Sequence, residues 1–335
     1  MGPVATDGTM SRCTRAPSTW TSSGIGTGAT RTGIPAQVAA LSMVLAGGSV
    51  LRCSPEDDPE TFGMAQVGLG ALGVISTVTL RCVPAFNLHS VEEPRPLDEV
   101  LERFDELSGA NDHFEFFWFP HTDVAQTFTN NRTDEPARPK GRVGAYLDDV
   151  LLENHAFGLV QRVGQGRPSW MPALARFTGR LLSRSEVVDR SDRVFANERL
   201  VRFAEMEYAI PVRHAVPAVR ELRSMIERAG LRVSFPIEVR VLGADEVPLS
   251  MAYGRASAFI AVHVYWKQEY ERYFREVEAI MDGFDGRPHW GKLHFQAAGT
   301  LRPRYPLWDR FLAVRDRLDP DRVFGNPYLD RVLGP

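Results

Sequence analysis

The stretch that decides the fold is residues 237–241, Ile-Glu-Val-Arg-Val, in which aliphatic residues alternate with one carboxylate and one guanidinium. Successive side chains of a β-strand point to opposite faces, so Glu238 and Arg240 share one face, roughly 6–7 Å apart, and the aliphatic side chains share the other. Such alternation predicts a strand in a sheet that packs one face on a core.

A second stretch, residues 260–265, repeats the pattern as Ile-Ala-Val-His-Val-Tyr. If the two strands pair, His263 and Tyr265 join Glu238 and Arg240 on one surface. One interpretation is the solvated face of an antiparallel sheet with a weak surface ion pair. The other is a binding surface, because histidine and aromatic neighbours are less typical of a purely solvent-facing patch.

Outward from these strands, the chain alternates strands with helices, and Gly109 and Gly230 follow two of the helices where C-caps belong. This order favours an α+β fold, with an antiparallel sheet covered by helices on one face. Residues 131–200 give no clear pattern. The expected strands are 38–45, 50–53, 74–80, 114–119, 203–210, 231–242 and 257–266, and the expected helices are 59–67, 96–107, 216–229, 269–281 and 308–318.

Composition sets wider bounds on the function. A length of 335 residues suggests about two domains of roughly 150 residues each. The net charge of −3 gives no electrostatic reason to expect nucleic acid or an acidic membrane as a partner. No apolar run is long enough for a membrane span, and the N-terminus does not resemble a secretory signal. The three widely spaced cysteines, Cys13, Cys53 and Cys82, indicate free thiols in a reducing cytoplasm.

The hexapeptide at residues 289–294, His-Trp-Gly-Lys-Leu-His, holds Lys292, one of only three lysines in the chain. Its histidines are five residues apart, a spacing that fits neither a helical i, i+4 pair nor the HExxH motif, so no metal site is expected. A buried lysine that supplies positive charge beside an anionic group is one interpretation. An ordinary loop is the other.

Gly68, Gly70 and Gly73 formally match the GxGxxG pattern. A dinucleotide fingerprint follows a strand and opens a helix, whereas these glycines precede the strand expected at residues 74–80. A classical NAD site is therefore not expected. The glycines either let the backbone approach a ligand closely or form a plain tight turn.

Taken together, five motifs resemble the aldonolactone oxidase family, which includes the L-gulonolactone and D-arabinono-1,4-lactone oxidases. The resemblance covers residues 26–335 and implies an FAD flavoprotein of the vanillyl-alcohol-oxidase type. The string His-Trp-Gly-Lys-x-His and the terminal Asn-Pro-Tyr are its most specific parts. The motifs are GLGALGVI at 68–75, EMEYAIP at 205–211, EVR at 238–240, HWGKLH at 289–294 and NPY at 326–328.

The resemblance implies a layout of domains. Residues 34–85 and 288–335 would form a partial FAD-binding domain, the remnant of a two-lobe domain. Residues 86–287 would form the substrate-binding cap, and residues 1–33 an aberrant or disordered leader.

The resemblance also implies a reaction, the oxidation of a hydroxyl group of a sugar-1,4-lactone with hydride transfer to flavin N5. Glu238 and Arg240 would bind and polarise the substrate hydroxyls, and Lys292 would stabilise negative charge as the hydroxyl proton is lost. The residues implied to bind FAD are Gly26, Thr27, Gly28, Gly70, Gly73, Val74, Ile75 and His289.

The implied partners are a sugar lactone or polyol and an electron acceptor, either oxygen or a cytochrome- or quinone-type molecule. Nucleic acid is not among them. The implied location is the cytoplasm, with membrane association left open in the absence of a transmembrane segment.

The sequence departs from the family pattern at its start, where the family's His-Gly-Thr-Gly segment survives only as Ile25 to Gly28. No front lobe for the FAD pyrophosphate is recognised, which suggests that residues 1–25 are a shifted translation of the coding strand. Two alternatives to an aldonolactone oxidase therefore stay open, a truncated remnant without flavin and an alditol oxidase.

Overall fold

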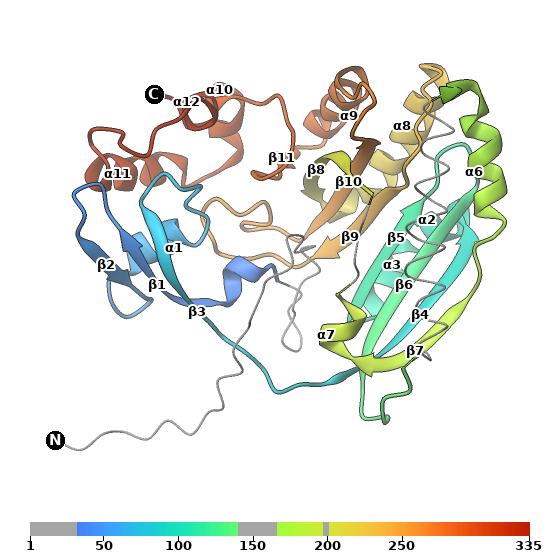
Figure 1. The fold of residues 1–335 in the computed structure, drawn as a ribbon, viewed down its shortest axis with the longest axis horizontal. Coiled ribbons are helices and arrows are strands. Elements are labelled where there is room, and N and C mark those ends of the chain that lie inside the picture. Colours follow the sequence, from blue (N-terminus) through green and yellow to red (C-terminus); the bar gives the residue numbers. More distant parts are fainter. Residues whose placement is uncertain (1–31, 140–165, 197–200) are drawn as a thin grey trace.

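The computed structural model describes residues 32–139, 166–196 and 201–335, and these residues form two antiparallel sheets (Figure 1). The small sheet has the order β2-β1-β3, with β1 (Val38–Val44), β2 (Val50–Cys53) and β3 (Val74–Leu80). The large sheet has the order β11-β8-β10-β9-β5-β6-β4-β7. Its strands are β4 (Asn87–Pro96), β5 (His113–Trp118), β6 (Val124–Thr133), β7 (Ser185–Arg190), β8 (Phe203–Pro211), β9 (Ile237–Leu242), β10 (Ser257–Tyr265) and β11 (Arg287–Pro288). The α+β class expected from the sequence is confirmed.

The small sheet owes its shape to tight turns. A hairpin joins β1 to β2, with Gly48 at φ +81° and the Leu45 amide donating to the Ser49 carbonyl at 2.9 Å. Helix α1 (Pro59–Ala65) follows, capped by the Asp58 carboxylate, which accepts from the Thr61 amide. Gly73 then turns the chain into β3 at φ +154°.

The C-terminal helices pack on the small sheet, so both ends of the described chain share one core (Figure 1). These helices are α10 (Ala298–Leu301), α11 (Trp308–Leu318) and α12 (Pro327–Leu333). Trp308, Phe311 and Leu329 are buried there against Met43 and Phe62. This shared core fixes where residues 288–335 lie relative to the strands at 38–80.

Helices cover one face of the large sheet. They are α2 (Leu97–Glu102), α3 (Phe104–Ala110), α8 (Ala215–Arg228) and α9 (Glu271–Gly283). Their apolar sides join every second residue of the central strands in one core, including Phe116, Tyr208, Val239, Ile260 and Val262. The other face of the sheet is thereby left for polar side chains.

Two expected elements were wrong in extent. The strand expected at 231–242 is a strand only over β9, because Gly230 turns the chain out of α8 at φ +61° and Pro236 has no amide hydrogen to donate to a ladder. The helix expected at 96–107 breaks at Arg103, whose φ of −102° and ψ of 15° are not helical. Gly109 accordingly lies within α3, which ends at Asn111 instead.

Candidate active site beneath the HWGKLH loop

The polar face of the large sheet is buried. Side chains alternate along β8, β9 and β10 as the sequence predicts, and the residues opposite the helix-covered core include charged groups. Glu207 is 1% exposed, Glu238 4% and Arg240 5%. Ionised side chains are rarely buried this deeply unless they are paired, so the interpretation as a solvated sheet face is wrong.

The strand register places the charges around one small residue. Strand β10 lies between β8 and β9, and Ala261 pairs with Glu207 on one side and with Glu238 on the other. On the same pattern Phe259 pairs with Arg240, whose guanidinium carbon lies 5.8 Å from the phenyl centroid. Because alanine ends at Cβ, the strand between the two carboxylates carries no long side chain.

A continuous set of ion pairs joins these residues to Lys292. Arg240 pairs with Glu207 and, at 3.1 Å, with Glu238. Lys292 Nζ lies 2.5 Å from one carboxylate oxygen of Glu207 and 2.5 Å from one of Glu205. We call the set Glu205, Glu207, Glu238, Arg240 and Lys292 the charge network.

His263 borders the charge network on the Glu205 side. Its Nε2 lies 3.2 Å from Glu205 Oε1, and its ring lies 4.9 Å, edge-on, from the ring of Phe203. Tyr265 is buried at the end of the same strand, where it contacts Trp266 at a ring separation of 6.3 Å. Of the two residues that the sequence places beside Glu238 and Arg240, His263 therefore reaches the network directly and Tyr265 flanks it.

Backbone pairing with β8 positions the loop at residues 289–294. The His289 amide donates to the Glu207 carbonyl and the Leu293 amide to the Glu205 carbonyl, both at 2.9 Å. A turn closes between them, with the Lys292 amide donating to the His289 carbonyl at 3.0 Å. Lys292 is thus fixed opposite the two glutamates by the same strand that carries them.

The outer side of the loop contacts the core that the small sheet shares with the C-terminal helices. Trp290 Nε1 donates to the Leu249 carbonyl at 2.8 Å, and the Tyr328 hydroxyl donates to the Trp290 carbonyl at 2.6 Å. His294 Nε2 lies 3.1 Å from the Tyr328 oxygen, and the Asn326 side chain caps α12. The HWGKLH and NPY motifs therefore form one contact, which joins the charge network to the small-sheet core.

Electrostatics keeps Glu205, Glu207 and Lys292 ionised. Burial by itself would raise the pKa of Glu205, but the hydrogen bond and charge of His263, together with Lys292, outweigh it and lower the pKa to about 2. Burial opposes ionisation of Glu207 too, and Arg240 and Lys292 overcome it and hold its pKa far below the usual range. Burial would lower the pKa of Lys292, but Glu207 and Glu205 raise it. Lys292 is therefore a fixed cation.

The histidines of the loop are neutral. Burial lowers the pKa of His289, whose Nδ1 accepts from the Gly291 amide at 3.1 Å. Burial, with the charge of Arg331, lowers the pKa of His294 to about 4. Among residues 32–139, 166–196 and 201–335, no three His, Cys, Asp or Glu side chains gather as a metal site would require.

Of the residues implied to bind FAD, His289 lies beside the charge network, and Gly70, Gly73, Val74 and Ile75 lie at the start of β3 and in the turn before it. Gly70 has φ +73° and open space where a Cβ would stand. Packing within the fold already requires glycine at residue 73, because a Cβ there would lie 3.0 Å from the Val44 carbonyl oxygen. Val74 and Ile75 open β3, whose seven residues are all exposed. Gly26, Thr27 and Gly28 lie outside the described residues.

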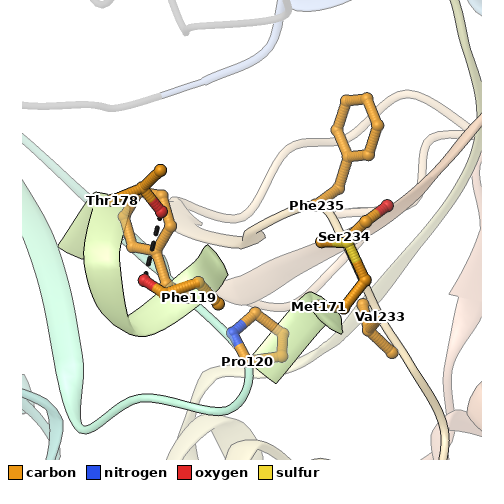
Figure 2. Close-up of a pocket in the computed structure, with 8 residues that line it drawn as sticks. Phe119, Pro120, Met171, Thr178, Val233, Ser234 and Phe235 are labelled. Atoms are coloured by element: carbon orange, nitrogen blue, oxygen red, sulfur yellow. Dashed lines mark hydrogen bonds between the residues drawn. The ribbon is translucent and has the colours of Figure 1, made fainter. Parts of the chain in front are cut away.

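A small apolar crevice is lined in part by Phe235 (Figure 2). It is lined by Phe119, Pro120, Met171, Ala175, Thr178, Val233, Ser234 and Phe235. The Phe235 ring lies 6.0 Å from that of His263, so this wall lies beside the network. Thr178 turns its hydroxyl back to the Ala175 carbonyl at 3.1 Å, which leaves an apolar lining unsuited to a polyhydroxylated molecule.

Comparison with solved structures identifies the class of fold. A cholesterol oxidase from Brevibacterium sterolicum superposes with a TM-score of 0.75 at 15% identity, over 91% of this chain and 70% of that one. The chain therefore shares the fold of this cholesterol oxidase. The family model for D-arabinono-1,4-lactone oxidase matches residues 78–332. The chain belongs to the D-arabinono-1,4-lactone oxidase family.

Curated relatives agree with this assignment. An L-gulono-1,4-lactone dehydrogenase of Mycobacterium tuberculosis is 50% identical over 310 residues, which cover 92% of this chain and 72% of that protein. An L-gulonolactone oxidase of Scyliorhinus torazame is 33% identical with the same coverage. An alditol oxidase of a Streptomyces species is 30% identical over 92% of this chain and 70% of that protein. The resemblance drawn from the five motifs is confirmed.

Glu205 and Glu207 were not expected in the site from the sequence. The signal was present, because Glu-Met-Glu-Tyr at residues 205–208 alternates in the same way as Glu-Val-Arg at 238–240. Both carboxylates therefore lie on the polar face, where they bridge Arg240 and Lys292.

Proposed function

We propose that the chain is an FAD-dependent oxidoreductase that oxidises a hydroxyl group of a sugar-1,4-lactone. The observation that carries this proposal is the buried charge network, in which Glu238 and Arg240 of the cap sheet meet Lys292 of the HWGKLH loop through Glu207. The names of the relatives, gulonolactone dehydrogenase and gulonolactone oxidase, support a lactone as the substrate.

Glu238 and Arg240 are proposed to bind the substrate hydroxyls. Glu238 offers carboxylate oxygens that accept hydrogen bonds, and the guanidinium of Arg240 offers several donors in a fixed plane. A polyhydroxylated ring needs both kinds of group. Ala261 lies between Glu238 and Glu207 in the sheet register, and we place the ring over this short side chain.

Lys292 is proposed to stabilise the negative charge that develops on the substrate oxygen as its proton leaves. Its raised pKa excludes a role as a neutral base, so it acts through its charge. Preorganised charges in a water-poor site need little rearrangement during the reaction, which is why they accelerate it. Glu205 and Glu207 hold Lys292 in place and balance its charge before substrate binds.

FAD, when bound, would accept the hydride released from the substrate carbon. Among the described residues, Gly70, Gly73, Val74, Ile75 and His289 are proposed to hold it, and Gly26, Thr27 and Gly28 complete the proposed set. The exposed apolar side chains at the start of β3, beside a glycine turn with open space around Gly70, suit a flat aromatic ring system. This glycine turn and the exposed apolar side chains beside it therefore fit the flavin part of the cofactor.

We further propose that residues 34–85 and 288–335 belong to the FAD-binding domain and residues 86–287 to the cap. The two buried cores support this division, since one draws mainly on 38–72 and 301–333 and the other on 97–281. Either oxygen or a cytochrome- or quinone-type molecule reoxidises the flavin in this proposal.

The proposed location is the cytoplasm. Cys53 and Cys82 are free thiols, as expected in a reducing compartment. No helix among the described residues combines the length and apolarity needed to cross a bilayer.

The test is anaerobic mixing of the full chain with FAD and then with lactone. We expect purified chain to take up FAD, and L-gulono-1,4-lactone to bleach its absorbance faster than xylitol does. Faster bleaching by xylitol would make the chain an alditol oxidase. Protein that stays colourless with added FAD would overturn the proposal in favour of a sugar-binding remnant.

A further inference from the structure

Lys292 is held between two glutamates that the fold fixes to different degrees. Its Nζ lies 2.5 Å from Glu207 Oε2 and 2.5 Å from Glu205 Oε1. The side chain of Glu207 is fully buried and also pairs with Arg240. The side chain of Glu205 is 21% exposed, at the rim of the charge network. A partly exposed ion pair gains little by itself, because holding two long side chains in one geometry costs conformational entropy. Glu205 therefore needs a second contact to keep one orientation.

His263 of β10 provides this second contact. Its Nε2 lies 3.2 Å from Glu205 Oε1, the same oxygen that Lys292 contacts. Burial favours the neutral form of Glu205, and the hydrogen bond from His263 is the largest of the influences that outweigh burial and lower its pKa to about 2. An ionised carboxylate can only accept hydrogen bonds, so Nε2 carries the hydrogen and donates it.

The imidazole ring of His263 is itself fixed by its surroundings. The residue is 4% exposed, and the sheet register sets it directly opposite Glu205. The Phe203 ring lies edge-on to the imidazole with 4.9 Å between the centroids, and the Phe235 ring lies 6.0 Å away. The imidazole Nδ1 lies 3.4 Å from the Pro236 carbonyl oxygen. The donor to Glu205 is therefore held in place by packing on both strands.

We propose that His263 is a positioning residue that acts on Lys292 through Glu205, an inference that rests on the proposed oxidation of a lactone. The ammonium group of Lys292 has three hydrogens. In the described part of the chain Glu205 and Glu207 accept two of them, and the third is directed at the substrate oxygen on which negative charge develops. With Glu205 held by His263, the two ion pairs fix the direction of that third hydrogen.

Loss of the His263 donor frees one of these two anchors. The carboxylate of Glu205 then turns towards water, and Lys292 swings on its pair with Glu207 alone. A charge that must be reoriented during the reaction stabilises the transition state less than one that is already in place. The loss therefore slows the reaction more than it weakens substrate binding.

Two variants of His263 separate hydrogen-bond donation from packing. His263→Phe keeps an aromatic ring beside Phe203 and removes the donor, and His263→Gln gives up the ring but supplies an amide N–H. In FAD-loaded chain we expect the limiting rate of flavin reduction by L-gulono-1,4-lactone to fall at least about tenfold in His263→Phe. His263→Gln should restore it to within about threefold, and the lactone concentration at half-maximal rate should change less than about threefold in both. An unchanged rate in His263→Phe, or equal losses in the two variants, would overturn the inference.

A double-mutant cycle shows whether the effect passes through Glu205. In a Glu205→Ala background the contact is already lost, so adding His263→Phe should slow flavin reduction less than about twofold. The same loss in both backgrounds would mean that His263 acts by another route, and the inference would fail. His89→Phe is the matched control, because His89 pairs with Glu186 in an exposed part of the same sheet. Its rate should equal that of the unaltered chain.

Nuclear magnetic resonance of Lys292 tests the same contact without FAD or lactone. The chain contains three lysines, so in protein made with isotope-labelled lysine the Lys292 Cε signal is assigned by its loss in Lys292→Met. We expect this signal to shift in His263→Phe, to return in His263→Gln and to stay in place in His89→Phe. Circular dichroism checks the fold of each variant, and His263→Leu replaces His263→Phe if the latter does not fold.

The two readouts distinguish failure of this inference from failure of the proposed function. A Lys292 signal that does not move when His263 loses its donor would overturn the inference, whatever the flavin does. A signal that moves as expected, in a chain whose flavin no lactone reduces, would uphold the action of His263 on Lys292 and overturn the proposed function alone.

Discussion

Lys292 Nζ lies 2.5 Å from Glu207 Oε2 across a sequence separation of 85 residues, and Glu207 also pairs with Arg240 through its other oxygen. One carboxylate, buried in β8, therefore bridges the guanidinium of the cap sheet and the ammonium of the HWGKLH loop. The bridge adds a side-chain link to the backbone pairing that holds the loop against β8.

Replacing the bridge should destabilise the whole protein. Glu207→Gln leaves Arg240 and Lys292 buried without the charge that balances them, and we expect the free energy of unfolding to fall by about 3–5 kcal/mol. Urea unfolding followed by circular dichroism measures this. The control is Glu186→Gln, which removes exposed ion pairs with His89 and Arg184 and should leave the midpoint nearly unchanged. Similar midpoints for the two variants would contradict a bridging role.

Lys292→Met should lower the rate of flavin reduction by lactone at least about a hundredfold, the size of effect found when a preorganised charge is removed. Stopped-flow absorbance on FAD-loaded protein measures the rate. Lys267→Met is the control, because Lys267 is an exposed lysine of the same chain beside Trp266. A normal rate in Lys292→Met would remove this residue from the mechanism.

The charge of Glu205 should make stability depend on acid pH. The pKa of Glu205 is about 2 in the folded protein, below its ordinary value of 4.5. The unfolded chain therefore binds protons first as the pH falls, so the contribution of Glu205 is complete above 4.5 and is lost towards 2. Unfolding free energies measured across this window should decline less steeply in Glu205→Gln. An identical slope in both proteins would be inconsistent with the ion pair to Lys292.

His294 should make stability depend on pH in a second range, which lies above that of Glu205. Its pKa falls from 6.5 to about 4 on folding, so protonation favours the unfolded chain and stability declines as the pH drops from 6.5 to 4. His294→Gln keeps a donor for the Tyr328 oxygen without a titratable group. We expect the decline between pH 6.5 and 4 in thermal melts to be shallower in this variant, with His289 contributing part of what is left, and an unchanged decline would assign it to other groups.

Gly73→Ala tests the turn into β3. The new Cβ would lie 3.0 Å from the Val44 carbonyl oxygen at a φ of +154°, and we expect a loss of about 1–3 kcal/mol in unfolding free energy. Gly109→Ala is the control, because Gly109 lies within α3 with open space around it, and it should be neutral or slightly stabilising. Equal effects would show that steric crowding is not what selects glycine at residue 73.

The alternation of polar and apolar residues along the strands accounts for most of what could be predicted. It placed Glu238 and Arg240 on one face and His263 beside them, because a buried sheet face imposes strict alternation on its strands. The local pattern could not show that the polar face is buried, since burial depends on the loop at 289–294, which arrives from much later in the chain. Strand β4 escaped notice because Pro94 and Pro96 disfavour a strand, and pairing with β6 and β7 outweighs that preference. Arg103 breaks a helix whose apolar spacing is continuous, so the break shows in its backbone angles and not in the sequence pattern.

The central claim is that the charge network activates a sugar lactone, and anaerobic reduction of the flavin in Glu238→Gln tests it most directly. We predict that L-gulono-1,4-lactone bleaches the FAD-loaded unaltered chain and leaves the flavin of Glu238→Gln oxidised over the same time. Bleaching of the variant at the unaltered rate, with FAD equally bound in both, would contradict the account.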